Sequence, residues 1–116
     1  MENVNLFKNG YEFASNCEKS FDDMHSKFES LKEDETSAFM LGYAFYLMET
    51  AKFLDGASTE SLNAKVNLGI ANQCLNSVIA LNNISSEDAL KLSSTMYEMA
   101  NQNIDDVANT ILQICQ

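Results

Sequence analysis

The chain has 116 residues, of which 17 are acidic and 7 basic, and its formal net charge is -10. This length suits one domain with one core, and the 46% share of hydrophobic residues separates the chain from disordered acidic tails. Every basic residue is Lys, so the chain offers neither the basic patch nor the Arg side chains that nucleic-acid binding uses. We expect a single helical domain over residues 1–116 that binds no nucleic acid and suits a basic protein partner.

Membrane and secretion signals are not visible in the sequence. The densest apolar stretch, residues 38–48, falls well short of the roughly 18 residues of a membrane span. We therefore expect no membrane insertion. The start of the chain lacks the basic flank and apolar run of a secretory signal peptide, as would the start of a mature secreted chain.

The scarcity of turn residues favours an all-α fold. Pro is absent and Gly occurs four times, which predicts helices joined by polar loops. From Val4 to Leu31, apolar residues recur at steps of three or four and form one helical stripe. This stripe fits one long helix or two pieces that bend near Gly10 or around Ser20. With the segments that follow, we expect a compact bundle of four to five helices.

The second expected helix is the most apolar. A run of acids precedes it, and Asp34, Thr36 or Ser37 is expected to cap its start. The helix is expected over about 37–54, and its apolar residues occupy nearly the whole circumference, so it should be central and most buried. Residues 55–59 then supply a Gly for a left-handed stop and a Ser or Thr for the next cap.

A third helix is expected over about 59–81, with Gly69 placed where another backbone can approach closely. The loop 82–88 follows, in which Ser85 and Asp88 form a weak capping box. The inward residues expected on this third helix are Leu62, Val66, Ile70, Leu75, Val78 and Ile79.

Two shorter helices are expected to close the chain. The first runs over about 86–101, and the second begins at about Asn103, where Asn103 and Asp106 form a capping signature. The inward residues expected on these two helices are Leu90, Leu92, Met96, Met99 and Ala100, and then Ile104, Val107, Ala108, Ile111, Leu112 and Cys115.

Catalytic machinery has no recognisable pattern here. No nucleophile lies at a known spacing from a base, and no metal-ligand set or phosphate-binding Gly loop is present in the sequence. His25 has acidic neighbours, which is ordinary for a helix histidine. Cys17 lies on the apolar stripe, which favours a core thiol or a disulfide partner over a reactive nucleophile. We expect no enzyme, no catalytic residue, no cofactor and no metal site.

The three cysteines leave two alternatives open. Cys17, Cys74 and Cys115 have no CxxC spacing, and a zinc site with His25 would need carboxylates as further ligands. One disulfide with one free thiol, and three reduced core thiols, both fit the composition.

Four pieces of the chain, read in order, match a family pattern. NGYEFASNC at 9–17 resembles its opening helix, and FMLGY at 39–43 resembles its central Phe-x-x-Gly-Tyr helix. Cys74 matches a Cys in the third quarter, and SSEDALKLSSTMYEMA at 85–100 with VANTILQIC at 107–115 resembles a closing helix pair that ends in Cys. This arrangement is similar to the Rap/Tai family, the immunity proteins against peptidoglycan amidase effectors of type VI secretion.

The resemblance also implies a disulfide and a compartment. Members commonly carry a second Cys after the central Phe, where this chain has Met40. If the family pairs its first Cys with that one, Cys17 is free and Cys74 bonds to Cys115. This bridge would stabilise the fold by about 3 to 4 kcal/mol in the chain-entropy model. It requires an oxidising compartment, so the resemblance implies the periplasm after removal of a signal peptide, whereas reduced cysteines imply the cytoplasm.

The function implied by the resemblance is inhibition. Such an immunity protein blocks the active-site cleft of its cognate peptidoglycan amidase effector and protects the producing cell. This needs a complementary shape, a protruding loop and favourable charge, with no catalytic residue. The polar loop after the third helix is the expected partner-binding element because its acids can meet a basic cleft rim. Its residues are Asn82, Asn83, Ser85, Ser86, Glu87 and Asp88.

Several alternatives stay open on the sequence. The loop 82–88 also fits an ordinary capped helix connection, and 55–60 is a second candidate loop. Gly42 and Tyr43 are interpreted as packing residues. A cytosolic acidic helical adaptor or secretion chaperone that binds a protein partner is the alternative function, and free cysteines would favour it. A homodimer is open too, because the N-terminal stripe is long enough to serve two faces or one bundle.

Overall fold

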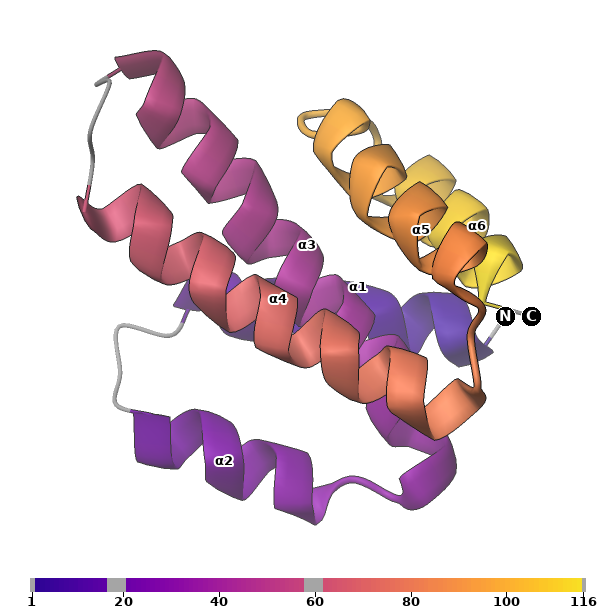
Figure 1. Ribbon diagram of the computed structural model, residues 1–116. Helices are drawn as coiled ribbons and strands as arrows, with labels where there is room; N and C mark the ends of the chain where they lie inside the picture. The colour runs from indigo at the N-terminus through magenta and orange to yellow at the C-terminus, as the bar shows by residue number, and fades with distance from the viewer. Residues whose placement is uncertain (1, 17–20, 58–61, 116) are drawn as a thin grey trace.

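A computed structural model describes the chain except for residues 1, 17–20, 58–61 and 116. For residues 2, 21–25, 33–34, 53–57 and 62–64 it describes the backbone but not the side chains. The described residues form helices and no strand, which confirms the all-α class. Figure 1 shows the six helices as a compact assembly. They are α1 (Glu2–Asn16), α2 (Phe21–Ser30), α3 (Glu33–Ala57), α4 (Leu62–Asn82), α5 (Ser86–Glu98) and α6 (Ile104–Ile114).

The N-terminal stripe forms two elements rather than one. α1 passes Gly10 without interruption and ends at Asn16, and α2 begins at Phe21. The division of the stripe accounts for one helix more than the four to five expected. The bend expected around Ser20 lies outside the described residues.

α3 begins four residues before its expected start because Lys32 and Glu35 cap it. The Lys32 N–H donates to Glu35 Oε1 at 3.0 Å, and the Lys32 carbonyl accepts from the Thr36 N–H at 3.1 Å. The Glu35 side chain therefore makes the half of a capping box that reaches back to the cap residue. The expected caps, Asp34, Thr36 and Ser37, are wrong because all three lie inside the helix.

The other end of α3 also differs from expectation. The helix continues through Asp55 and Gly56 to Ala57, and no described Gly has a positive φ. The expected left-handed stop at Gly56 is therefore wrong. A Gly inside a helix costs about 1 kcal/mol relative to Ala, which a long buried helix can offset through packing. The cap expected at Ser58 or Thr59 lies outside the described residues.

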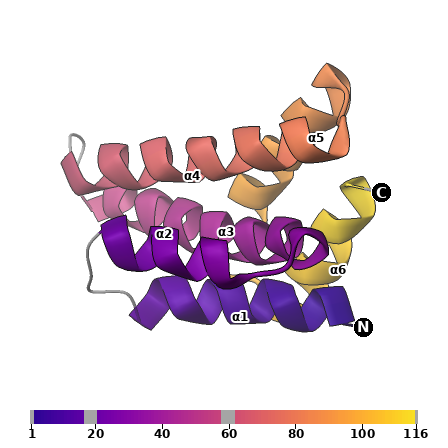
Figure 2. The ribbon, with the colours of Figure 1, turned by 90° about the horizontal axis from the view of Figure 1, so that it is seen from below.

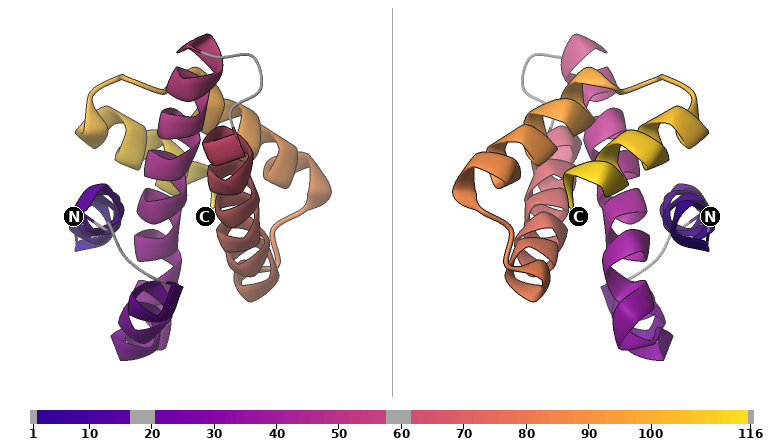
Figure 3. Two further views of the ribbon diagram at one scale, coloured as in Figure 1. Left: turned by 90° about the vertical axis from the view of Figure 1, so that its left-hand side faces the viewer. Right: turned by 90° about the vertical axis from the view of Figure 1, so that its right-hand side faces the viewer.

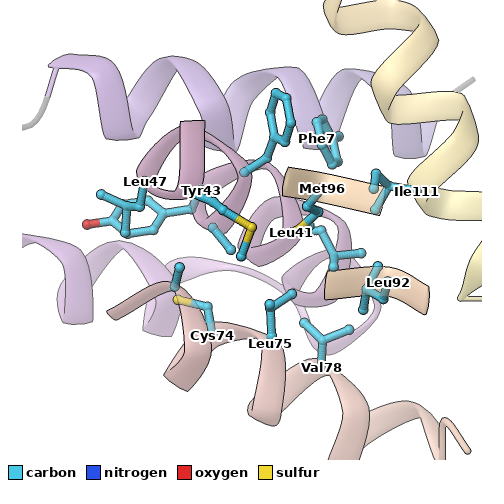
Figure 4. Close-up of a cluster of buried hydrophobic side chains, with 14 of the residues drawn as sticks. Phe7, Leu41, Tyr43, Leu47, Cys74, Leu75, Val78, Leu92, Met96 and Ile111 are labelled. Atoms are coloured by element: carbon cyan, nitrogen blue, oxygen red, sulfur yellow. The ribbon is translucent and has the colours of Figure 1, made fainter. Parts of the chain in front are cut away.

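α3 is the central helix of the assembly, as expected. Figure 2 shows it between α1 and α4, and α5 and α6 also contact it. Phe39, Leu41 and Phe45 of α3 are each 1% exposed. Side chains from five helices meet in one hydrophobic core beside it (Figure 4). The labelled members of this core are Phe7, Leu41, Tyr43, Leu47, Cys74, Leu75, Val78, Leu92, Met96 and Ile111.

α1 and α3 cross at a pair of glycines. A Cβ atom on Gly42 would overlap the carbonyl oxygen of Phe7, and one on Gly10 would overlap the carbonyl oxygen of Phe39. Any side chain at either position would force the two backbones apart, because interiors are packed without spare volume. The packing role expected for Gly42 is confirmed, and Gly10 is its partner rather than a bend.

Aromatic side chains continue this contact toward α2. Tyr43 is buried, and its ring centroid lies 6.1 Å from that of Phe13 and 5.4 Å from that of Phe28. Phe28 also meets Phe39 edge to face at 5.9 Å between centroids. Such pairs stabilise packing beyond the area that they bury. The packing role expected for Tyr43 is therefore confirmed.

One flank of α4 was misassigned from the sequence. Val66 is 50% exposed, and a Cβ on Gly69 would meet nothing within 4 Å. Leu75 and Val78 are buried as expected and share the inward face with Ala71, whereas the side chain of Leu62 is outside those described. Apolar residues occur on more than one side of α4, so helical spacing alone did not identify the side that faces α3.

Candidate binding surface

The expected partner-binding loop connects α4 to α5. α4 ends at Asn82 and α5 begins at Ser86, so only residues 83–85 lie between them. All six expected residues of the loop are exposed. Figure 3 shows this connection at an edge of the molecule, away from α1.

A backbone motif fixes the first half of this connection. Asn83 has a φ of 53°, in the left-handed region that Asn tolerates better than most residues. The Ile84 N–H donates to the Ile79 carbonyl at 3.1 Å. A left-handed residue followed by such a bond is the Schellman motif that ends helices. The Ile84 side chain packs against the core, so the connection is anchored in its middle.

The second half is fixed by the start of α5. Ser85 is the N-cap, and its Oγ accepts from the Asp88 N–H at 3.2 Å, which confirms this half of the expected capping box. Glu87 and Asp88 occupy the first turn, where the helix dipole favours acidic residues. The backbone of residues 82–88 is therefore held as in an ordinary capped helix connection. The polar side chains of this connection are exposed to solvent.

Asn82 has a positioning role in this connection. Its Nδ2 donates to Ser37 Oγ at 2.9 Å and to the Val78 carbonyl at 2.8 Å. The first bond joins the end of α4 to α3. Because the amide nitrogen already has two acceptors, Asn82 holds the connection against the rest of the molecule.

Cys74 and Cys115 are both free thiols in the structure, so the bridge implied by the resemblance is not present in it. Cys74 lies in the middle of α4 and points toward α3 (Figure 4), whereas Cys115 follows α6 and interacts with the charge of Asp88. Burial raises the pKa of each thiol to about 11, with the Asp88 charge contributing at Cys115. Both thiols are therefore protonated near neutral pH, which makes them poor nucleophiles.

Most of the remaining candidate residues lie outside the part of the chain that the structure describes. Cys17 and the side chain of His25 lie outside the described residues, and so do residues 58–60 of the second candidate loop. Within the described part of the chain, no three His, Cys, Asp or Glu side chains come close enough to hold a metal ion. The described helices include none with the length and apolar character of a membrane span.

A groove between α4 and α5 was missed by sequence reasoning. Its volume is about 480 Å³, and the buried Met48 of α3 lies at its base. Leu90, expected to point inward, is 75% exposed at this groove, and Tyr97 is 43% exposed. Leu90 and the buried Leu92 are two positions apart on a helix, about 200° around its axis, so only one of them can face the core. The groove-lining residues are Met48, Leu68, Asn72, Leu90, Ser93, Ser94, Tyr97 and Glu98.

Lys52 of α3 holds one wall of the groove in place. Its Nζ donates to the Tyr97 carbonyl at 2.9 Å and lies 4.7 Å from the centroid of the Tyr97 ring. The second contact is a cation–π interaction. With the Lys52 charge engaged here, Glu98 is the one charged residue among the described residues that line the groove.

Glu49, one turn before Lys52, joins three parts of the fold. Its Oε2 accepts from the Asn101 N–H at 2.6 Å, and its Oε1 accepts from the Tyr11 hydroxyl. Burial and this carboxylate raise the pKa of Tyr11 well above its ordinary value, so the phenol stays a donor. Glu49 thus ties α1 and the α5–α6 connection to α3. Glu49 and Lys52, two opposite charges just after the apolar stretch 38–48, were the available sequence signal.

No protein family, curated protein or solved structure was found to match this chain. The likeness to the Rap/Tai family therefore stays a prediction that rests on its motif residues.

Proposed function

We propose that this chain is an immunity protein that binds and blocks the active-site cleft of a type VI secreted peptidoglycan amidase effector. The observation that carries the proposal is the α4–α5 connection, where exposed polar and acidic side chains stand on a backbone capped at both ends. A pre-organised loop loses little conformational freedom on binding, so more of the contact energy becomes affinity. The motif resemblance supplies the class of partner.

The residues of the connection divide into two roles in this proposal. Asn82 and Ser85 position the backbone through their hydrogen bonds. Glu87 and Asp88 present carboxylates to the rim of the cleft, with Asn83 and Ser86 beside them. A net charge of -10 favours rapid association with a basic rim.

The test measures inhibition of peptidoglycan hydrolysis by a panel of purified type VI amidase effectors. Asp88→Lys reverses one contact charge, and Asp106→Lys is its matched control. Both residues are exposed and lie three positions after an N-cap residue. The backbone N–H of Asp88 donates to Ser85 Oγ at 3.2 Å, and that of Asp106 donates to Asn103 Oδ1 at 3.4 Å. Asp105 is less suitable because it pairs with Lys8 at 3.0 Å.

The proposal expects the unmodified chain to inhibit at least one amidase. Asp88→Lys should weaken that inhibition by about tenfold or more, and Asp106→Lys by about twofold or less, because only the first charge meets the partner. Inhibition of none of the amidases contradicts the proposal. An equal loss in both variants contradicts the role of the α4–α5 connection.

The free thiols favour a second candidate, a cytosolic acidic helical adaptor or secretion chaperone that binds a protein partner. Cys74 and Cys115 are not bonded to each other in the structure, and unbonded cysteines are usual in cytoplasmic proteins, whereas the immunity role belongs to the periplasm. Intact-mass measurement with thiol counting, on protein purified without reductant, separates the two. A bridge between two cysteines favours the periplasmic immunity role, and three thiols that stay reduced in air favour the adaptor.

A further inference from the structure

The groove between α4 and α5 exposes apolar side chains that the rest of the fold does not cover. Leu90 and Tyr97 stand on the α5 side, with Ser93 and Ser94 between them along the helix. Leu68 stands on the α4 side, and Met48 lies at the base. None of these residues belongs to the connection that carries the proposed function.

The spacing of these residues fits an incoming helix. Leu90 and Tyr97 are seven positions apart, which places them on one face of α5 and about 10 Å apart along its axis. The serines between them are small, so a backbone can approach there. On α4, Leu68 and Asn72 are four positions apart and also share a face. Grooves that accept amphipathic helices offer apolar contacts at such spacings.

The charge of the groove selects the kind of helix. Glu98 is the charged residue among the described residues that line the groove, and Lys52 already bonds to the Tyr97 carbonyl and contacts its ring. A Lys or Arg on the incoming segment would complement the Glu98 carboxylate. A second copy of the chain suits the groove less well, because two molecules of net charge -10 repel each other.

We infer that the α4–α5 groove binds an amphipathic helical segment of a protein partner, with the apolar face of that segment on Leu90 and Tyr97 and a basic residue opposite Glu98. This inference does not depend on the partner being an amidase. Lys52 acts as a positioning residue, since it holds Tyr97 from the side of α3.

The test selects binders to the full chain from a displayed library of random peptides. A peptide length of about 14 residues is suitable because shorter isolated helices are marginal in water. Selected peptides are then measured by fluorescence anisotropy against the unmodified chain and its variants. The inference expects them to share apolar residues at one helical face and at least one Lys or Arg.

Two pairs of variants locate the binding. Leu90→Ser removes a groove contact, and Leu81→Ser is its control, because Leu81 is 54% exposed on α4 and does not line the groove. Glu98→Lys reverses the lining charge, and Glu12→Lys makes the same change on the exposed surface of α1. Leu90→Ser and Glu98→Lys should each weaken binding by about tenfold, and the controls by about twofold or less. Far-UV circular dichroism checks that all four variants stay folded.

Several results would overturn the inference. One is that none of the selected peptides binds more weakly to the Leu90→Ser variant than to the unmodified chain. Another is equal binding by a scrambled peptide of the same composition, which would indicate attraction by net charge alone. A third is a dimer of the unmodified chain in analytical ultracentrifugation that becomes a monomer in Leu90→Ser, because a second copy would then occupy the groove.

Discussion

The two sides of α3 are built differently. On one side, α1 approaches so closely that Gly10 and Gly42 touch the opposing backbone. On the other side, α4 and α5 leave a groove of about 480 Å³ between them. The glycines differ in the same way, because those of the first side face a backbone, whereas Gly69 of α4 faces open space. Close helix contact here depends on the absence of a side chain at the crossing, and apolar composition alone does not produce it.

The largest expected effect tests the closed side. Gly42→Ala places a Cβ on the Phe7 carbonyl oxygen, so α1 must move away and lose packing. We expect the free energy of unfolding to fall by about 3 kcal/mol, at the high end for overpacking, and Gly10→Ala to have a similar effect. Urea denaturation measures both.

Gly69→Ala is the matched control for these variants. Its Cβ meets nothing within 4 Å, and Ala is the better helix former, so the free energy of unfolding should rise by about 0.5 to 1 kcal/mol. A loss of stability at Gly69, or no loss at Gly42, would mean that the glycine crossing does not distinguish the two sides.

A second prediction concerns the hydrogen bonds that join α1 and the α5–α6 connection to α3. Tyr11→Phe removes the hydroxyl that donates to Glu49, and we expect the free energy of unfolding to fall by about 1 kcal/mol. Glu49→Leu removes both acceptors and leaves the Asn101 N–H without this partner, so the loss should be about 2 kcal/mol.

A double-mutant cycle by urea denaturation checks whether these residues act together. We expect a coupling energy of about 1 kcal/mol between Tyr11→Phe and Glu49→Leu. In Glu49→Leu, amide hydrogen exchange at Asn101 should also become faster. Additive losses and unchanged exchange would contradict the joint role of Glu49 on both sides of α3.

The sequence predicted what depends on near neighbours along the chain. The burial of α3 could be predicted because its apolar residues surround the helix. The caps at Ser85 and Asn103 could be predicted because a capping side chain bonds to a backbone N–H within three residues. The same local reasoning misplaced the start of α3, since Glu35 capped backward from inside the helix.

Features that depend on distant residues were not readable in the same way. Glu49 bonds to Tyr11 and Asn101, which are 38 and 52 positions away, and no periodic pattern points to those partners. The exposure of Leu90 follows from how α5 is rotated on α3, and the groove follows from α4 and α5 together. The candidate loop was located by its polar residues, whereas the groove required the relative placement of three helices.

A third prediction tests the groove side. Lys52→Met keeps an apolar stem but removes the bond to the Tyr97 carbonyl and the cation–π contact with its ring. We expect a loss of about 1 kcal/mol in the free energy of unfolding, smaller than the effects on the closed side. A library-selected peptide should also bind more weakly, since Tyr97 is no longer held. Unchanged stability together with unchanged peptide binding would show that Lys52 does not position this wall.

The effect expected to be smallest at neutral pH concerns the contact between α3 and α4, where Cys74 is buried. Burial raises the pKa of this thiol from 9.0 to about 11, so the folded state favours the protonated form. This stabilisation is fully present below pH 9 and is lost as the pH rises through about 11. Urea denaturation at a series of pH values should therefore show a decline in stability over this window that is smaller in Cys74→Ala. Parallel declines in the two proteins would mean that the α3–α4 contact admits water to the thiol, and the α4 side of α3 would then be more open than the burial of Cys74 indicates.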